Sequence, residues 1–183
     1  LSYSTHSSCV PYIPITWNST ADATISYSGG SYSVSDDFAI YSPDSNAGKV
    51  FIYQLKRSSS GIITVSVIRE ISAYSSISNF GKQVKICNYH AAIMSGVSGS
   101  GSESVYVFDR YTQISVNQWN KITTKVYNID KPHRFSIAEN VLVVCARYDN
   151  KFYIFSRSPS GWGSTASVIY SGDSGKQLGE SCA

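Results

Sequence analysis

Short runs of β-branched and aromatic residues, each followed by a cluster of Ser, Gly and Asn, recur along this whole chain. The clearest runs are residues 38–41, 50–53, 62–68, 105–108, 141–144 and 152–155. This pattern is typical of many short antiparallel strands. We find no long stretch with the helical period of about 3.6 residues. The sequence therefore predicts an all-β fold.

Composition narrows the class further. Only 15% of the 183 residues are charged and 13% are aromatic, while 35 are Ser and 9 are Thr. A helical bundle needs more Ala, Glu, Lys and Leu, and a disordered chain needs more charge. The net charge of +3 is spread along the chain, so we expect no nucleic acid partner. No apolar run reaches the roughly 18 residues of a membrane span. We expect one globular domain over residues 1–183.

An internal repeat runs through three consecutive segments, each made of a strand, a turn, a hydrophobic strand, a loop and a third strand. The turns fall at Asp36-Asp37, Asn88-Tyr89 and Glu139-Asn140. The third strands carry Tyr53, Phe108 and Phe155, at spacings of 55 and 47 residues. Units of about 50 residues with several strands each are typical of β-propeller blades.

The best-defined unit opens with Phe80-Gly81, has the third strand 105–110 (VYVFDR) and ends near Trp119. It resembles the FG-GAP repeat, the blade of integrin-α-like β-propellers. The resemblance implies about four blades: residues 28–79, 80–130, 131–177, and a composite blade of 178–183 plus 1–27. Two openings depart from the pattern, because Gly29 lacks a preceding Phe and Pro132-His133 replaces the pair. We expect Gly81 to permit a positive φ or a close strand approach, and the aromatic residues to fill the space between blades.

The composite blade follows from Leu178-Gly179, which looks like the opening of another unit only a few residues before Ala183. Read from the C-terminus into the N-terminus, the second strand of this blade is residues 7–10. We therefore expect the two termini to form adjacent strands. Such pairing closes a ring within one chain, joins chains head to tail in a filament, or belongs to a longer tandem array. The sequence leaves these alternatives open.

The four cysteines, Cys9, Cys87, Cys145 and Cys182, have no C-x-x-C spacing, which argues against zinc. In the composite blade, Cys182 and Cys9 take the offsets of Val84 and Met94, which we expect to face each other around a turn. This register predicts a Cys9–Cys182 disulfide. A Cys87–Cys145 disulfide then follows by elimination.

Patterns that carry chemistry are weak in this sequence. Residues 172–175 (GDSG) imitate a serine-protease nucleophile loop, but Lys176 replaces the usual Gly and no His has the matching surroundings. The loops at the places of FG-GAP calcium loops hold one carboxylate each, too few for calcium. We expect no catalytic residue, no metal ligand and no cofactor.

The sequon at Asn18, the hydroxyl-rich surface and the even cysteine count favour an extracellular protein that is glycosylated at Asn18. Two functions fit. The first is a secreted structural or adhesive module that acts by protein–protein contact, with self-association into filaments or arrays through strand pairing. The alternative is a lectin-like carbohydrate- or receptor-binding domain, in which Trp17 stacks on a sugar ring.

Overall fold

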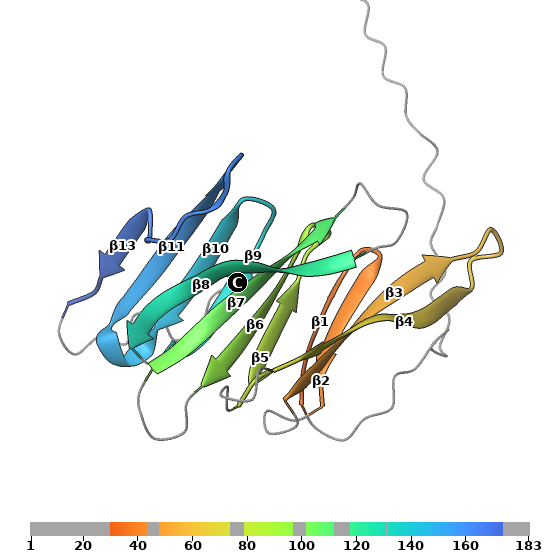
Figure 1. Ribbon diagram of the computed structural model, residues 1–183, viewed down its shortest axis with the longest axis horizontal. Helices are drawn as coiled ribbons and strands as arrows, with labels where there is room; N and C mark the ends of the chain where they lie inside the picture. Colours follow the sequence, from red (N-terminus) through yellow and green to blue (C-terminus); the bar gives the residue numbers. More distant parts are fainter. Residues whose placement is uncertain are drawn as a thin grey trace, which may run out of the picture.

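In the computed structural model the chain is built from antiparallel β-sheets (Figure 1). The structure describes residues 30–43, 48–73, 79–96, 102–111, 118–130 and 132–173. The only helical element in these ranges is one 3₁₀ turn, η1 (Arg147–Asp149). The predicted all-β class is therefore confirmed. No helix in the described ranges is long and apolar enough to cross a membrane.

The strands form three sheets in chain order. The first sheet holds β1 (Ser31–Ser35), β2 (Phe38–Ser42), β3 (Lys49–Arg57) and β4 (Ile63–Ser72). The second holds β5 (Gln83–Ile86), β6 (His90–Gly96), β7 (Ser102–Tyr111) and β8 (Gln118–Asp130). The third holds β9 (Arg134–Ile137), β10 (Val141–Ala146) and β11 (Lys151–Ser158), and both β12 (Gly161–Trp162) and β13 (Val168–Ser171) pair with β11. Within the first two sheets, strands that follow one another along the chain thus lie side by side.

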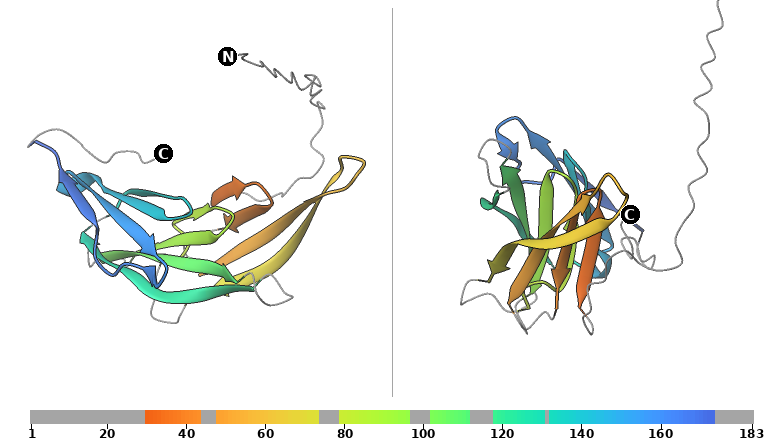
Figure 2. Two further views of the ribbon diagram at one scale, coloured as in Figure 1. Left: turned by 90° about the horizontal axis from the view of Figure 1, so that it is seen from above. Right: turned by 90° about the vertical axis from the view of Figure 1, so that its right-hand side faces the viewer.

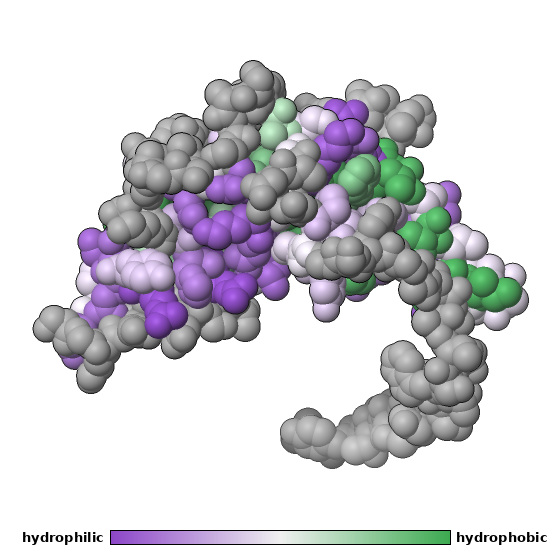
Figure 3. Space-filling view, turned by 90° about the horizontal axis from the view of Figure 1, so that it is seen from below, coloured by the Kyte–Doolittle hydropathy of each residue, from purple (hydrophilic) through white to green (hydrophobic). Residues whose placement is uncertain are grey.

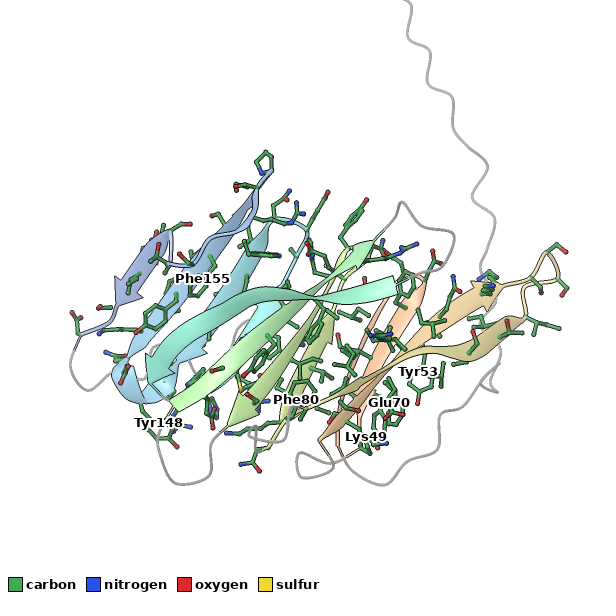
Figure 4. The ribbon with its side chains drawn as sticks, in the orientation of Figure 1. Lys49, Tyr53, Glu70, Phe80, Tyr148 and Phe155 are labelled. Atoms are coloured by element: carbon green, nitrogen blue, oxygen red, sulfur yellow. The ribbon has the colours of Figure 1, made fainter. Side chains whose placement is uncertain are left out.

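One register underlies all three sheets, as the sequence repeat predicts. Tyr53, Phe108 and Phe155 lie opposite Ala39, Ala91 and Leu142, respectively. Each of these partners is the second residue after its turn. The equivalence of the three aromatic positions is therefore confirmed, and Figure 4 labels Tyr53 on β3 and Phe155 on β11. Trp119 and Trp162 also match, since they lie opposite Arg110 and Arg157.

The sheets pack face to face around two hydrophobic cores. One core joins the first and second sheets, with Phe38, Ile40 and Ile52 on one side and Phe80, Val84, Ile86, Ala91, Ile93 and Phe108 on the other. The second core joins the second and third sheets through Ala92, Met94, Val105, Val107, Phe135, Leu142, Val144 and Phe155. Phe80, Phe108 and Phe155 thus fill the space between sheets, as predicted. Tyr53 does not, because it lies on the face of the first sheet turned away from the second, beside Ala39 and Tyr41.

Seen from above, the sheets follow one another in an arc, with β4 and β8 toward its outer side (Figure 2). The described strands form an open half-barrel and do not by themselves make up a four-bladed ring. Each sheet falls within one of the predicted segments 28–79, 80–130 and 131–177. The segments of the predicted composite blade, 1–27 and 178–183, lie outside the described residues.

Candidate functional site

A glycine lies at the closest approach between the first and second sheets. Gly81 has a φ of 94°, and a Cβ at this position would stand 2.0 Å from the hydroxyl oxygen of Ser42 and 3.2 Å from a Val50 methyl group. The expected positive φ and close approach are both confirmed. Hydrogen bonds also join β1 and β5, the first strands of the two sheets. The N–H groups of Val84 and Ile86 donate to the hydroxyls of Ser31 and Ser33 at 3.0 and 3.3 Å.

The second interface contains a buried polar cluster around His90. The Nδ1 atom of His90 lies 2.5 Å from Oδ1 of Asp109, and its Nε2 atom lies 2.8 Å from the carbonyl oxygen of Glu139. Arg157 approaches the other oxygen of Asp109 at 3.5 Å, and the ring of Trp162 meets the His90 ring edge-on at 5.2 Å. The cluster thus joins β6 and β7 of the second sheet to β11, β12 and the β9–β10 turn of the third.

The hydrogen bonds of His90 decide what this cluster does. Both ring nitrogens lie within hydrogen-bond distance of protein oxygen atoms, so both are engaged inside the fold. A general base needs a nitrogen that is free to accept a proton from a substrate, and neither nitrogen is. Burial raises the pKa of Asp109, but the hydrogen bond and charge of His90, together with Arg157, outweigh it and lower that pKa overall. The cluster therefore fits a tie between two sheets and does not fit a catalytic site.

Cys87 and Cys145 are not bonded to each other, so this predicted disulfide is wrong. Cys87 is a free thiol just after β5, and its pKa is raised, chiefly by burial. Cys145 is disulfide-bonded. Its neighbours Leu142, Val144 and Ala146 face the second sheet, so Cys145 points the other way, away from the sheet that carries Cys87. Elimination, without a spatial argument, produced the incorrect pair.

The register behind the predicted Cys9–Cys182 pair is also wrong. Met94 lies opposite Gln83, while Val84 lies opposite Ile93. Val84 and Met94 consequently point to opposite faces of the second sheet, Val84 toward the first sheet and Met94 toward the third. Cys9 and Cys182 themselves lie outside the described residues, as do Trp17 and Asn18.

No group of three His, Cys, Asp or Glu side chains suited to a metal ion occurs in the described part of the chain. Glu103 pairs with Lys82 at 2.5 Å. Asp173 of the GDSG motif lies beyond β13, and the Ser of that motif is outside the described ranges.

The first sheet presents an end face on the side away from the second sheet. Its centre consists of the buried side chains of Ala39, Tyr41 and Tyr53. Tyr32 and Val34, which lie opposite Tyr41 and Ala39, share this face and are 76% and 61% exposed. Figure 3 shows hydrophobic side chains, in green, gathered at the end of the molecule that the first sheet forms.

The third sheet presents the opposite end face. Val143 and Cys145 of β10 lie on it, with Ile154 and Phe152 of β11 opposite them. Val168 and Tyr170 of β13 extend the same face, and the rings of Phe152 and Tyr170 stack at 4.6 Å. Val168 and Tyr170 are 41% and 51% exposed, whereas Cys145 is only 3% exposed. Each end face of the described stack is therefore apolar, with a buried centre and exposed residues at its edge.

No protein-family model matches this chain, and none of the curated proteins matches its sequence. The features of the described chain that bear on function are thus the two interfaces and the two end faces.

Proposed function

We propose that this chain is a secreted structural or adhesive module of the FG-GAP-like propeller type, acting by protein–protein contact through its two end faces. The observation that carries the proposal is the register of the first sheet's end face. Ala39, Tyr41 and Tyr53 occupy the positions of Ala91, Ile93 and Phe108, through which the second sheet packs on the sheet before it. The first sheet thus has a face of the kind that packs on a preceding sheet.

The two end faces are complementary in kind. Throughout the stack, one face of a sheet receives the inner strand and buried residues of the next sheet, and the third sheet keeps such a receiving face at Val143, Phe152 and Ile154. A stack with a receiving face at one end and a packing face at the other is continued by a further sheet from its own termini or by another copy. The first case gives a four-bladed ring, and the second gives head-to-tail assembly into filaments or arrays.

Secretion is supported by the disulfide at Cys145, since disulfides persist mainly in oxidising compartments. Low charge supports self-association, because electrostatic repulsion between copies is weak. We assign no catalytic role, and the double engagement of His90 supports that choice. The lectin alternative depends on Trp17, and no described residue favours it. A glycan array on the native chain and on Trp17→Ala tests it directly.

Light scattering after size-exclusion chromatography tests the proposal. The native chain is expected to form oligomers at high concentration that dissociate in Val34→Lys, which places a charge on the first sheet's end face. Ile62→Lys is the matched control, because Ile62 is similarly exposed, at 57%, but lies beside the β3–β4 turn. A chain lacking residues 178–183 extends the test. Collapse of oligomers to folded monomers supports assembly between chains, unfolding supports a closed ring, and a native chain that stays monomeric overturns self-association.

A further inference from the structure

The third sheet's end face contains a cysteine whose disulfide partner is not among the described residues. Cys145 is disulfide-bonded and Cys87 is free, so a partner within this chain is either Cys9 or Cys182. The partner reaches Cys145 from the open side of the sheet, because the other side packs on the second sheet. A bond from Cys145 to either of them is incompatible with the predicted Cys9–Cys182 pair within the chain.

The first interface shows what packs at the position equivalent to Cys145. Ser42 and Cys145 each lie five residues after their turns, opposite the first residues of their inner strands, Ser31 and Arg134. The opening of the next unit packs there. Gly81 lies against the hydroxyl of Ser42, and three residues later the N–H of Val84 donates to Ser31 at 3.0 Å. The Val84 side chain is buried between the two sheets.

The C-terminal segment repeats this spacing. Cys182 follows Gly179 by three residues, as Val84 follows Gly81. The connection is also similar in length: Leu178 comes seven residues after the end of β13 at Ser171, and Phe80 comes eight after the end of β4 at Ser72. A segment placed in this register brings Cys182 in front of the Arg134–Cys145 pair, with its side chain directed at the third sheet.

Cys9 does not fit this position. In the composite blade it takes the place of Met94, which points toward the following sheet and away from the preceding one. We therefore propose that residues 178–183 cover the third sheet's end face as the inner strand of a further sheet, and that Cys182 is the disulfide partner of Cys145. This inference rests on the proposed function, because it names the occupant of one of the two end faces.

The bond itself requires an oxidant. The thiols of Cys145 and Cys182 lose two protons and two electrons as the S–S bond forms, and a disulfide-carrying oxidant of the secretory route accepts the electrons by thiol–disulfide exchange. The oxidant's own disulfide is reduced to two thiols in the same exchange.

Non-reducing peptide mapping of the full chain tests the pairing, because trypsin places the four cysteines in separate peptides: 1–49, 86–110, 135–147 and 177–183. We expect peptide 135–147 to be linked to 177–183, and peptides 1–49 and 86–110 to be alkylated without prior reduction. A link between 135–147 and 1–49 overturns the inference and leaves the proposed function standing. A link between 135–147 and 177–183 that is found only in a disulfide-linked dimer also overturns it, because the partner then belongs to a second copy.

Matched cysteine variants test whether the bond holds the segment on the sheet. Cys182→Ser is expected to lower the midpoint of thermal unfolding by about 5–10 °C, because the loop from 145 to 182 is no longer closed. Cys87→Ser is the control and is expected to leave the midpoint and the peptide link unchanged. A midpoint equal to that of the native chain in Cys182→Ser contradicts the proposed role. The outcome is independent of self-association, since a chain with the Cys145–Cys182 bond that stays monomeric overturns only the assembly proposal.

Discussion

A Cβ atom on Gly81 would stand 2.0 Å from the hydroxyl oxygen of Ser42, although the two residues belong to different sheets. The spacing between the first and second sheets therefore depends on the missing side chain at residue 81. The same residue has a φ of 94°, which glycine adopts without strain. Steric room and backbone conformation thus both require glycine at this position.

Gly81→Ala is expected to lower the free energy of unfolding by about 3 kcal/mol or more, from overpacking against Ser42 and Val50 together with backbone strain. Gly61→Ala separates the two causes, because Gly61 has a φ of 87° and no atom lies within 4 Å of the place that a methyl group would take. Its expected loss is about 1 kcal/mol. Urea unfolding followed by circular dichroism measures both. Equal losses in the two variants contradict the steric account.

His90 and Asp109 are expected to behave as one energetic unit. Removing Asp109 leaves the buried His90 without its main partner, and removing His90 does the same to the partly buried Asp109, so His90→Leu and Asp109→Asn each cost about 1–3 kcal/mol. The double variant is expected to lose less than the sum, by about 1–2 kcal/mol. A double-mutant cycle from urea unfolding measures the coupling. Glu70→Gln serves as the control, since Lys49 and Glu70 form an exposed pair and little change is expected. Additive losses at His90 and Asp109 contradict the inter-sheet tie.

The same pair predicts how stability depends on acid. The pKa of Asp109 is lower in the folded chain than its ordinary value of 3.8, so its carboxylate favours the folded state above that value. The contribution is lost as pH falls below 3.8 through the folded pKa. The native chain and Asp109→Asn should therefore differ in unfolding free energy at pH 6 and converge toward pH 2. If the difference in unfolding free energy stays constant over this pH range, the effect of the substitution comes from packing and not from the charge of Asp109.

Much of the sheet architecture follows from the sequence because the repeat fixes the register. Once the turns at Asp36-Asp37, Asn88-Tyr89 and Glu139-Asn140 are located, antiparallel pairing places each third-strand aromatic opposite the second residue after its turn. The same register also places His90 opposite Asp109, a pair that the sequence analysis did not identify. Phe108 lies opposite Ala91, so its neighbour Asp109 lies opposite His90. The pairing of a carboxylate with an imidazole was thus implied by the register.

The partners across the interfaces were less predictable, because they depend on which face of a strand each residue occupies. An error of one position in register moves a side chain to the other face, and this error paired Val84 with Met94. The hydrogen bond between His90 and the Glu139 carbonyl joins two residues that are 49 positions apart in sequence and lie in different sheets. Strand pairing within a single sheet gives no indication of such a contact.

The reactivity of the Cys87 thiol tests whether the end of β5 is buried as the structure shows. Its pKa is raised above the ordinary value of 9.0, chiefly because the half-buried site disfavours the charged thiolate. Thiolate is the form that reacts with alkylating reagents, so Cys87 should react slowly in the folded chain. We expect iodoacetamide at pH 8 to modify peptide 86–110 more slowly in the native chain than in urea. The exposed thiol of free cysteine, measured under both conditions, controls for any effect of urea on the reagent. A native rate equal to the unfolded rate shows that Cys87 is exposed, and it contradicts the burial that raises its pKa.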